Sequence, residues 1–143
     1  MSISTSTIWS TIFNIVSGMS YTHPLGSGHK YVFASFPDTL VEDKTAYPII
    51  VINHVDLTQE EKTYNVMEYV AEVNIDIFTT NSELLDTLTD KVIKEIQSNR
   101  DTLEGAGLYR GLVTSSTTSM VVRSGMKVHM RSLKFEFLVG DCI

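Results

Sequence analysis

The 143-residue sequence has one cysteine, three prolines and one tryptophan, and it contains no long hydrophobic run. Because Cys142 is the sole cysteine, no disulfide can form within the chain and no thiolate cluster can hold a metal. No stretch approaches the roughly 18 apolar residues of a membrane span, and the N-terminal segment lacks a basic leader. We therefore expect a soluble protein that is made in a reducing, cytosolic compartment and does not contact a membrane.

Basic residues are also scarce relative to acidic ones. The sequence has 11 Lys and Arg against 17 Asp and Glu, which gives a formal net charge of -6 and a pI near 5.1. Proteins that grip nucleic acid through its phosphates are usually basic, so the composition argues against that class. The hydrophobic content of 43% is enough for one core without metal or disulfide support. We predict a single domain over residues 1–143.

Residues that carry enzyme chemistry do not form recognisable constellations. The four histidines lack the spacing of zinc ligands, and no serine stands in a G-x-S-x-G elbow. The glycines of Gly26–Lys30 and Gly105–Gly107 miss the full spacing of phosphate and dinucleotide loops, so both stretches are most simply turns. We expect no catalytic residue, no metal and no cofactor.

The clearest pattern lies between Glu68 and Phe78 (EYVAEVNIDIF), where apolar and polar residues alternate. This alternation predicts a half-buried strand. Its polar face comprises Glu68, Glu72, Asn74 and Asp76. Upstream, Ile49–Val55 opens with four β-branched residues, which is typical of a strand covered on both faces. We expect the polar stretch 56–65 to be an exposed, turn-like loop that joins these strands into an antiparallel pair.

Two segments have the apolar spacing of amphipathic helices. The first covers about residues 4–19 and the second residues 83–97. For the second, Thr80 with Glu83 fits a capping box, and Ser82 is an equally good cap. The predicted buried positions are Ile8, Ile12, Ile15, Val16 and Met19 in the first helix and Leu85, Leu88, Val92 and Ile96 in the second.

Further strands are expected at residues 31–36, 108–113 and 127–139. The polar run Thr114–Ser119 (TSSTTS) predicts a mobile hairpin tip or arm covering about residues 114–125. In the last strand the apolar phase slips by one residue near Ser132, for which a β-bulge or a bend is the simplest cause. The predicted fold is α+β, with a mixed, mostly antiparallel sheet of about four to five strands and two helices packed on one face.

Charge is distributed unevenly along the chain. Acidic residues of the first half include Glu42, Asp43, Asp56, Glu60 and Glu61, whereas the last third carries Arg110, Arg123, Lys127, Arg131 and Lys134. A head-to-tail contact between copies could use this asymmetry, and the alternative is an ordinary solvated surface. The candidate interface residues are Glu60, Glu61, Glu68, Glu72, Asp76, Arg110, Arg123, Lys127 and Arg131.

The order of these segments resembles the tail terminator, or tail-completion, proteins of long-tailed bacteriophages. The resemblance covers an N-terminal amphipathic helix, the segment FASFPDTLVEDKTAYPIIVINHV, the polar hairpin, the strand VAEVNIDIFTTN, the helix ELLDTLTDKVIKEIQ and the closing strand VHMRSLKFEFLV. The likeness lies in the order of the segments and in their residue patterns across most of the chain, and it does not rest on a catalytic motif.

Membership of that family would imply a ring, usually of six subunits, at the head-proximal end of the tail. Such a ring stops growth of the tail tube and offers a surface for joining the head. The implied partners are other copies of the chain, the major tail tube protein, the head-completion or stopper protein and, as a further contact, the tape measure protein. DNA would pass through an acidic lumen without specific binding. The implied locations are the virion and, during assembly, the host cytoplasm.

Other classes of function remain as alternatives. A head-completion or stopper protein of the phage connector is also a small ring-former, but such proteins more often resemble small β-barrels, whereas here the helix at residues 83–97 falls between sheet strands. A soluble adaptor, a small-ligand binding domain and a minor enzyme are the non-viral alternatives.

Overall fold

The computed structural model describes residues 5–19, 21, 30–35, 47–63, 66–123 and 125–139, with the backbone alone for 59–63, 66–68, 123 and 126. The elements in chain order are α1 (Thr5–Ser17), β1 (Val32–Phe33), β2 (Ile49–Thr63), β3 (Val66–Thr79), α2 (Ser82–Ser98), α3 (Arg100–Gly105), β4 (Leu108–Arg123) and β5 (Met126–Val139).

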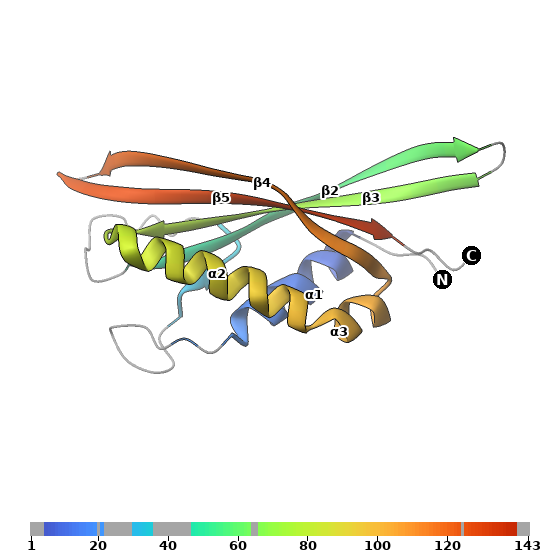
Figure 1. Ribbon diagram of the computed structural model, residues 1–143, viewed down its shortest axis with the longest axis horizontal. Helices are drawn as coiled ribbons and strands as arrows, with labels where there is room; N and C mark the ends of the chain where they lie inside the picture. Colours follow the sequence, from blue (N-terminus) through green and yellow to red (C-terminus); the bar gives the residue numbers. More distant parts are fainter. Residues whose placement is uncertain are drawn as a thin grey trace.

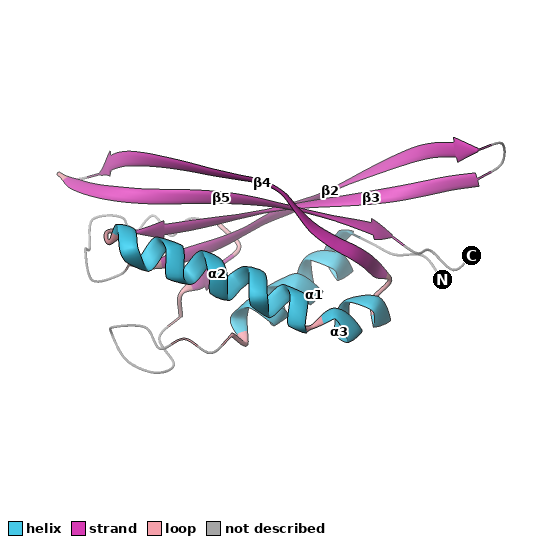
Figure 2. Cartoon of the chain, in the orientation of Figure 1, coloured by secondary structure: helices cyan, strands magenta, loops and turns pink. Residues whose placement is uncertain are grey.

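The strands form one sheet in the order β1-β2-β3-β5-β4. Only β1 is parallel to its neighbour β2, and the other pairs are antiparallel. All three helices lie on the same side of this sheet (Figures 1 and 2). The α+β fold predicted from the sequence is therefore confirmed, and the short helix α3 is an addition to the two predicted helices.

The main core lies between the helices and one face of the sheet. The alternation of β3 places Ala71, Val73, Ile75 and Ile77 on this face, all fully buried. The apolar stripe of α2 packs against them, and its four predicted positions are all buried. Together with α1, these residues make a single apolar cluster. Both predicted helices and the predicted strand at 68–78 are thus confirmed.

A second, smaller apolar cluster occupies the opposite face of the sheet. It contains Ile49 and Val51 of β2, Phe78 of β3 and Val128 of β5. The pairing of β3 with β5 is continuous from Tyr69 to Thr79, so the bulge, one of the two predicted causes of the phase slip near Ser132, is wrong. The phase of apolar residues in β5 changes because the two ends of the strand bury side chains on opposite faces.

The helix α2 is capped and anchored by side chains at its first turns. The cap is Asn81, whose Oδ1 accepts from the backbone N–H groups of Glu83 and Leu84, so the predicted caps Thr80 and Ser82 are wrong. Further along, Nη1 of Arg131 on β5 donates to Oδ1 of Asp86 at 2.7 Å. This ion pair joins the helix to the sheet beside the apolar core.

The helix α1 docks through a tryptophan hydrogen bond at an irregularity of β2. The register between β2 and β3 shifts between Ile52 and Val55, which leaves Asn53 and His54 opposite a single residue of β3. Nε1–H of Trp9 donates to the Ile52 carbonyl at 3.0 Å. The bulge keeps both Ile52 and Val55 in the helix-side core despite their odd spacing.

Two tyrosines close the C-terminal end of α1. The rings of Tyr21 and Tyr31 meet edge to face, with centroids 5.2 Å apart, and the Tyr31 hydroxyl donates to the Met19 carbonyl at 3.3 Å. Burial, which disfavours the phenolate, raises the pKa of both hydroxyls. Both side chains are therefore neutral at physiological pH and serve as packing and hydrogen-bonding groups.

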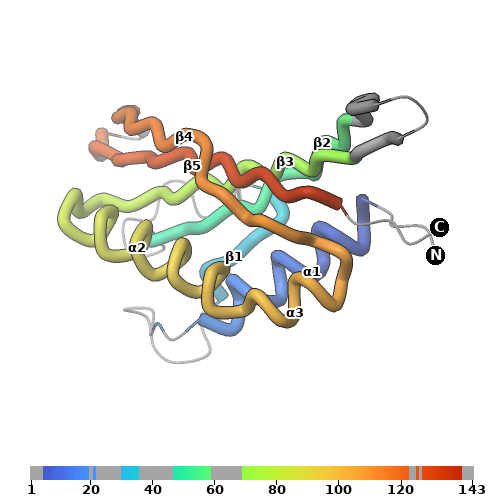
Figure 3. The backbone as a smooth tube through the Cα atoms, turned by 45° about the vertical axis from the view of Figure 1, so that its right-hand side comes forward, coloured from blue at the N-terminus to red at the C-terminus, as the bar shows by residue number. Residues whose placement is uncertain are grey.

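Two long hairpins extend from the body of the sheet. The β2–β3 and β4–β5 hairpins diverge toward opposite ends of the molecule (Figures 1 and 3). Residues 56–63, expected to be a loop, continue β2 and pair with β3. Residues 114–123, expected to be a mobile arm, continue β4 and pair with β5. Both loop predictions are wrong over these residues. The segments are polar and lack the apolar alternation that predicts a strand, but backbone pairing with the neighbouring strand holds them extended.

The predicted strand at 31–36 is confirmed only at Val32 and Phe33, which pair with Ile50 and Val51. Residue 36 lies outside the described part of the chain, as do the acidic residues Glu42 and Asp43.

The core assignment predicts that Leu88→Asp unfolds the protein. Leu88 is fully buried in the middle of α2, and a buried carboxylate without a partner costs several kcal/mol, against a total stability of about 5 to 15 kcal/mol. Circular dichroism during thermal denaturation should show no cooperative transition. The neighbouring Thr87→Asp places the same charge on the exposed side of α2 and should melt within a few degrees of the wild type. Equal melting of the two variants would contradict the assigned helix faces.

Candidate assembly surface

The strand β4 forms one edge of the sheet and is exposed over most of its length. It pairs with β5 on one side, and no described strand lies on the other. From Tyr109 to Val122 only Val113 is partly buried. The exposed apolar side chains on this strand include Leu112, Met120 and Val122, which are 62%, 52% and 65% exposed. We call residues 109–122 the β4 edge.

Two bulges shape the first half of the β4 edge. Arg110 and Gly111 both stand opposite Phe137, and Thr114 is an extra residue between the pairs formed by Val113 and Ser115. Arg110 takes a left-handed backbone conformation, with φ of 54°. Bulges of this kind bend a strand and increase its twist. The strand accordingly twists alongside β5 on its way from α3 to the tip of the hairpin (Figure 3).

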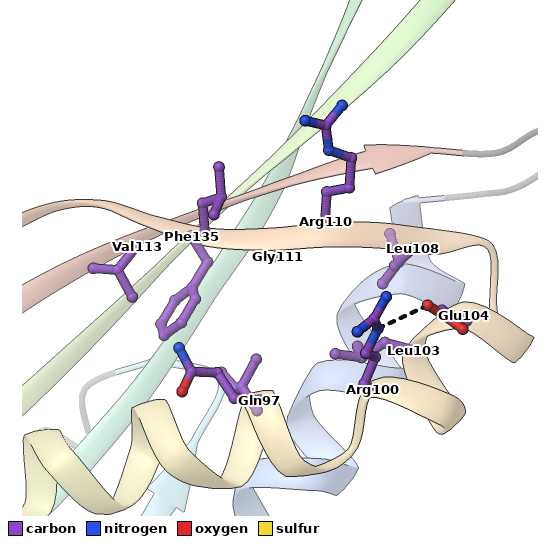
Figure 4. Close-up of a pocket in the computed structure, with 11 residues that line it drawn as sticks. Gln97, Arg100, Leu103, Glu104, Leu108, Arg110, Gly111, Val113 and Phe135 are labelled. Atoms are coloured by element: carbon purple, nitrogen blue, oxygen red, sulfur yellow. Dashed lines mark hydrogen bonds and ion pairs between the residues drawn. The ribbon is translucent and has the colours of Figure 1, made fainter.

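One hollow lies between the β4 edge and the helices. It encloses about 430 Å³, and Leu103, Leu108 and Phe135 supply its apolar lining. At its margin Nε of Arg100 donates to Oε1 of Glu104 at 3.0 Å (Figure 4). The hollow thus has an apolar interior and an ion pair at its rim.

A second hollow of about 330 Å³ involves the other side of β4. Its lining includes Arg110 and Leu112, which also line the first hollow, and the carboxylates of Glu72 and Glu136. These two glutamates are direct cross-strand neighbours on β3 and β5, an arrangement that is repulsive by itself. Lys134 relieves it, since its Nζ lies 3.2 Å from Oε2 of Glu72.

The predicted interface residues of the central sheet are engaged within the chain. Glu72 pairs with Lys134, and Oδ2 of Asp76 accepts a hydrogen bond from Nδ2 of Asn53 at 2.9 Å. Arg131, paired with Asp86, is only 19% exposed. These side chains hold the subunit together, which sequence reasoning missed because it did not know which strands were neighbours.

The remaining predicted interface residues fall on the two hairpins and the β4 edge. Lys127 is exposed near the tip of the β4–β5 hairpin, and the Arg110 side chain makes no hydrogen bond or ion pair with another described residue. The backbones of Glu60, Glu61, Glu68 and Arg123 lie in the outer parts of the hairpins. The structure therefore places Glu60, Glu61 and Glu68 on the β2–β3 hairpin and Arg123 and Lys127 on the β4–β5 hairpin, with Arg110 near the start of β4.

The described residues contain no group of three or more His, Cys, Asp or Glu side chains placed to hold a metal ion. None of the helices in the same part of the chain is long and apolar enough to cross a membrane.

The fold is similar to that of a chain in a solved structure described as the virion of a native gene transfer agent (GTA) particle. The match has a TM-score of 0.59 and 12% sequence identity, and it covers 98% of this chain and 100% of the other. At that identity the likeness shows a shared fold. No protein-family model matches the sequence, and no curated protein matches it.

The first bulge predicts a specific intolerance at Gly111. A Cβ there would lie 2.6 Å from Cε1 of Phe137, whose ring is buried, so Gly111→Ala should destabilise the protein by about 1 to 3 kcal/mol. Urea denaturation measures the change. Gly105→Ala is the matched control, since no atom lies within 4 Å of its new Cβ, and it should be neutral or slightly stabilising. An equal loss in both variants would argue against the bulge geometry.

Proposed function

We propose that this chain is a structural virion protein that forms a ring at the head-proximal end of a phage tail, with six subunits as is usual in the family that it resembles. In that position it ends polymerisation of the tail tube and provides the surface to which the head joins. Its partners are other copies of itself, the major tail tube protein and the head-completion or stopper protein, with the tape measure protein as a further contact.

The observation that carries this proposal is the fold match over the full length of both chains. A chain of a phage-like virion particle shares this fold over 98% of the present chain. Of the segments whose order resembles tail terminators, the described ones include α2 between β3 and β4, packed on the sheet.

The distribution of exposed side chains is consistent with a protein that works through contacts. The β4 edge presents apolar residues at up to 65% exposure, although the residues of the main core are buried. Exposed apolar groups on a strand with one unpaired edge favour association with another chain. Both hollows lie beside this strand.

A tail terminator is favoured over a stopper because of the sheet. The five strands form an open sheet covered by helices on one side, and the described strands do not close into a barrel. Head-side stoppers more often resemble small β-barrels. A non-viral adaptor would share the fold without acting on tail tubes.

Deletion of the gene in the parent phage tests the proposal. The expected result in electron micrographs is DNA-filled heads together with tails of uncontrolled length that do not join. Normal-length tails beside empty, leaking heads would instead identify a stopper. A normal phage yield would remove both phage assignments.

Imaging of the purified protein with tail tubes is the second test. Rings, or protein bound only at tube ends, are expected over a range of concentrations. Protein that remains monomeric and ignores the tubes would contradict the proposal. The tubes are a necessary part of the sample because assembly can require them as a template.

A further inference from the structure

The outer half of the β4 edge lacks the usual protection of an exposed strand. Natural edge strands are blunted by charged residues, proline or bulges. Residues 111–122 contain neither a charged residue nor a proline, and both bulges lie before Ser115. From Ser115 to Arg123 the pairing with β5 is unbroken, so the outer backbone groups of residues 115–122 face away from the sheet in a regular row.

A second unpaired edge lies on the opposite side of the sheet. β1 covers the outer side of β2 only at Ile50 and Val51. Beyond the bulge at Asn53 and His54, residues 56–61 pair in register with β3 on their inner side, and a second irregularity lies between Glu61 and Thr63. No described strand lies on the outer side of residues 56–63. Asp56, Leu57 and Thr58 are exposed there.

The two edges carry opposite charge. The β2 segment contains Asp56, Glu60 and Glu61 with the single Lys62, whereas no acidic residue occurs from position 111 to position 135. The tip beside the free part of β4 contains Arg123 and Lys127. Pairing β4 with β4 of another copy would bring like charges together, and pairing β4 with β2 brings opposite charges together.

We infer that residues 115–122 of β4 in one copy pair strand to strand with residues 56–63 of β2 in the next copy. The inference rests on the proposed ring and specifies the contact from which the ring is built. Such a contact is head-to-tail, since different surfaces of the two copies meet, and it closes into a ring when the rotation between copies allows. In a closed ring both edges would be covered.

Disulfide trapping tests the contact. In a Cys142→Ser background, one variant carries Thr58→Cys, and a set of eight variants carries a single cysteine at each position from 115 to 122. Paired strands lie about 5 Å apart, within the span of a disulfide. Mixed under mild oxidation, Thr58→Cys should link to the directly opposite position of the β4 set and more weakly to positions two residues away, which lie on the same face. Each variant alone should remain largely unlinked.

The outcomes separate the inference from the proposed function. Links within a single β4 variant would show a β4–β4 contact and overturn the inference, as would rings or tube-end caps that form without any Thr58 link. Absence of the link both with and without tubes likewise overturns it. Conversely, a clear Thr58 link in protein that never locates to tube ends would support the contact and count against the terminator function.

A glutamate on the edge provides an independent measurement. Met120 is half exposed, so Met120→Glu should preserve the melting temperature. A carboxylate there would meet the acidic β2 segment of the next copy, so the concentration for half-assembly should rise about tenfold or more. Thr87→Glu adds the same charge on the exposed side of α2 and should assemble like the wild type. Unchanged assembly of Met120→Glu, measured by sedimentation, would contradict the contact.

Discussion

Burial of the apolar face of β3 is the constraint on which the rest of the structure depends. This strand lies at the centre of the sheet, paired along its length with β2 and β5, and its side chains from Ala71 to Ile77 meet α1 and α2 in one core. Its alternation leaves no freedom of register, because a slip by one residue would expose the whole apolar set. Once β3 is fixed, its two long neighbours are fixed with it, and their free ends become the diverging hairpins.

The polar face of β3 shows how a surface can be used inside one subunit. Glu72 and Asp76 are satisfied by Lys134 and Asn53, side chains that come from the two strands flanking β3. On such a face, ion pairs and hydrogen bonds join neighbouring strands, and few charged side chains remain for contact with a partner. The potential for association is therefore concentrated at the sheet edges, where backbone groups and apolar side chains are both exposed. The arrangement accords with an assembly protein whose function is carried by contact surfaces.

The bulges divide each edge strand into parts with different roles. On β2 the bulge at Asn53 and His54 ends the half of the strand that is buried on both faces and begins the acidic half, in which Asp56, Leu57 and Thr58 are exposed. On β4 the bulges at Arg110, Gly111 and Thr114 twist the strand beside α3, and the regular pairing resumes beyond them. In both strands the exposed part follows the irregularity. A subunit built in this way presents two regular strand edges at opposite ends, which is the geometry that a head-to-tail chain of copies requires.

The sequence by itself determined α1, α2 and β3, because an apolar repeat of 3.6 or of 2 residues states which face is buried. It also determined the buried start of β2, whose continuous run of β-branched residues is typical of a strand covered on both faces. It could not determine the strands at 56–63 and 114–123, whose polar residues are held by backbone pairing with a neighbour and carry no such repeat. The same reason explains the misplaced bulge, since the phase change near Ser132 reflects a second apolar cluster on the far face. For the candidate surface, the sequence supplied the charge asymmetry. Only the tertiary structure decided which charged side chains form ion pairs within the subunit, as Arg131 does, and which strand edges have no described neighbour.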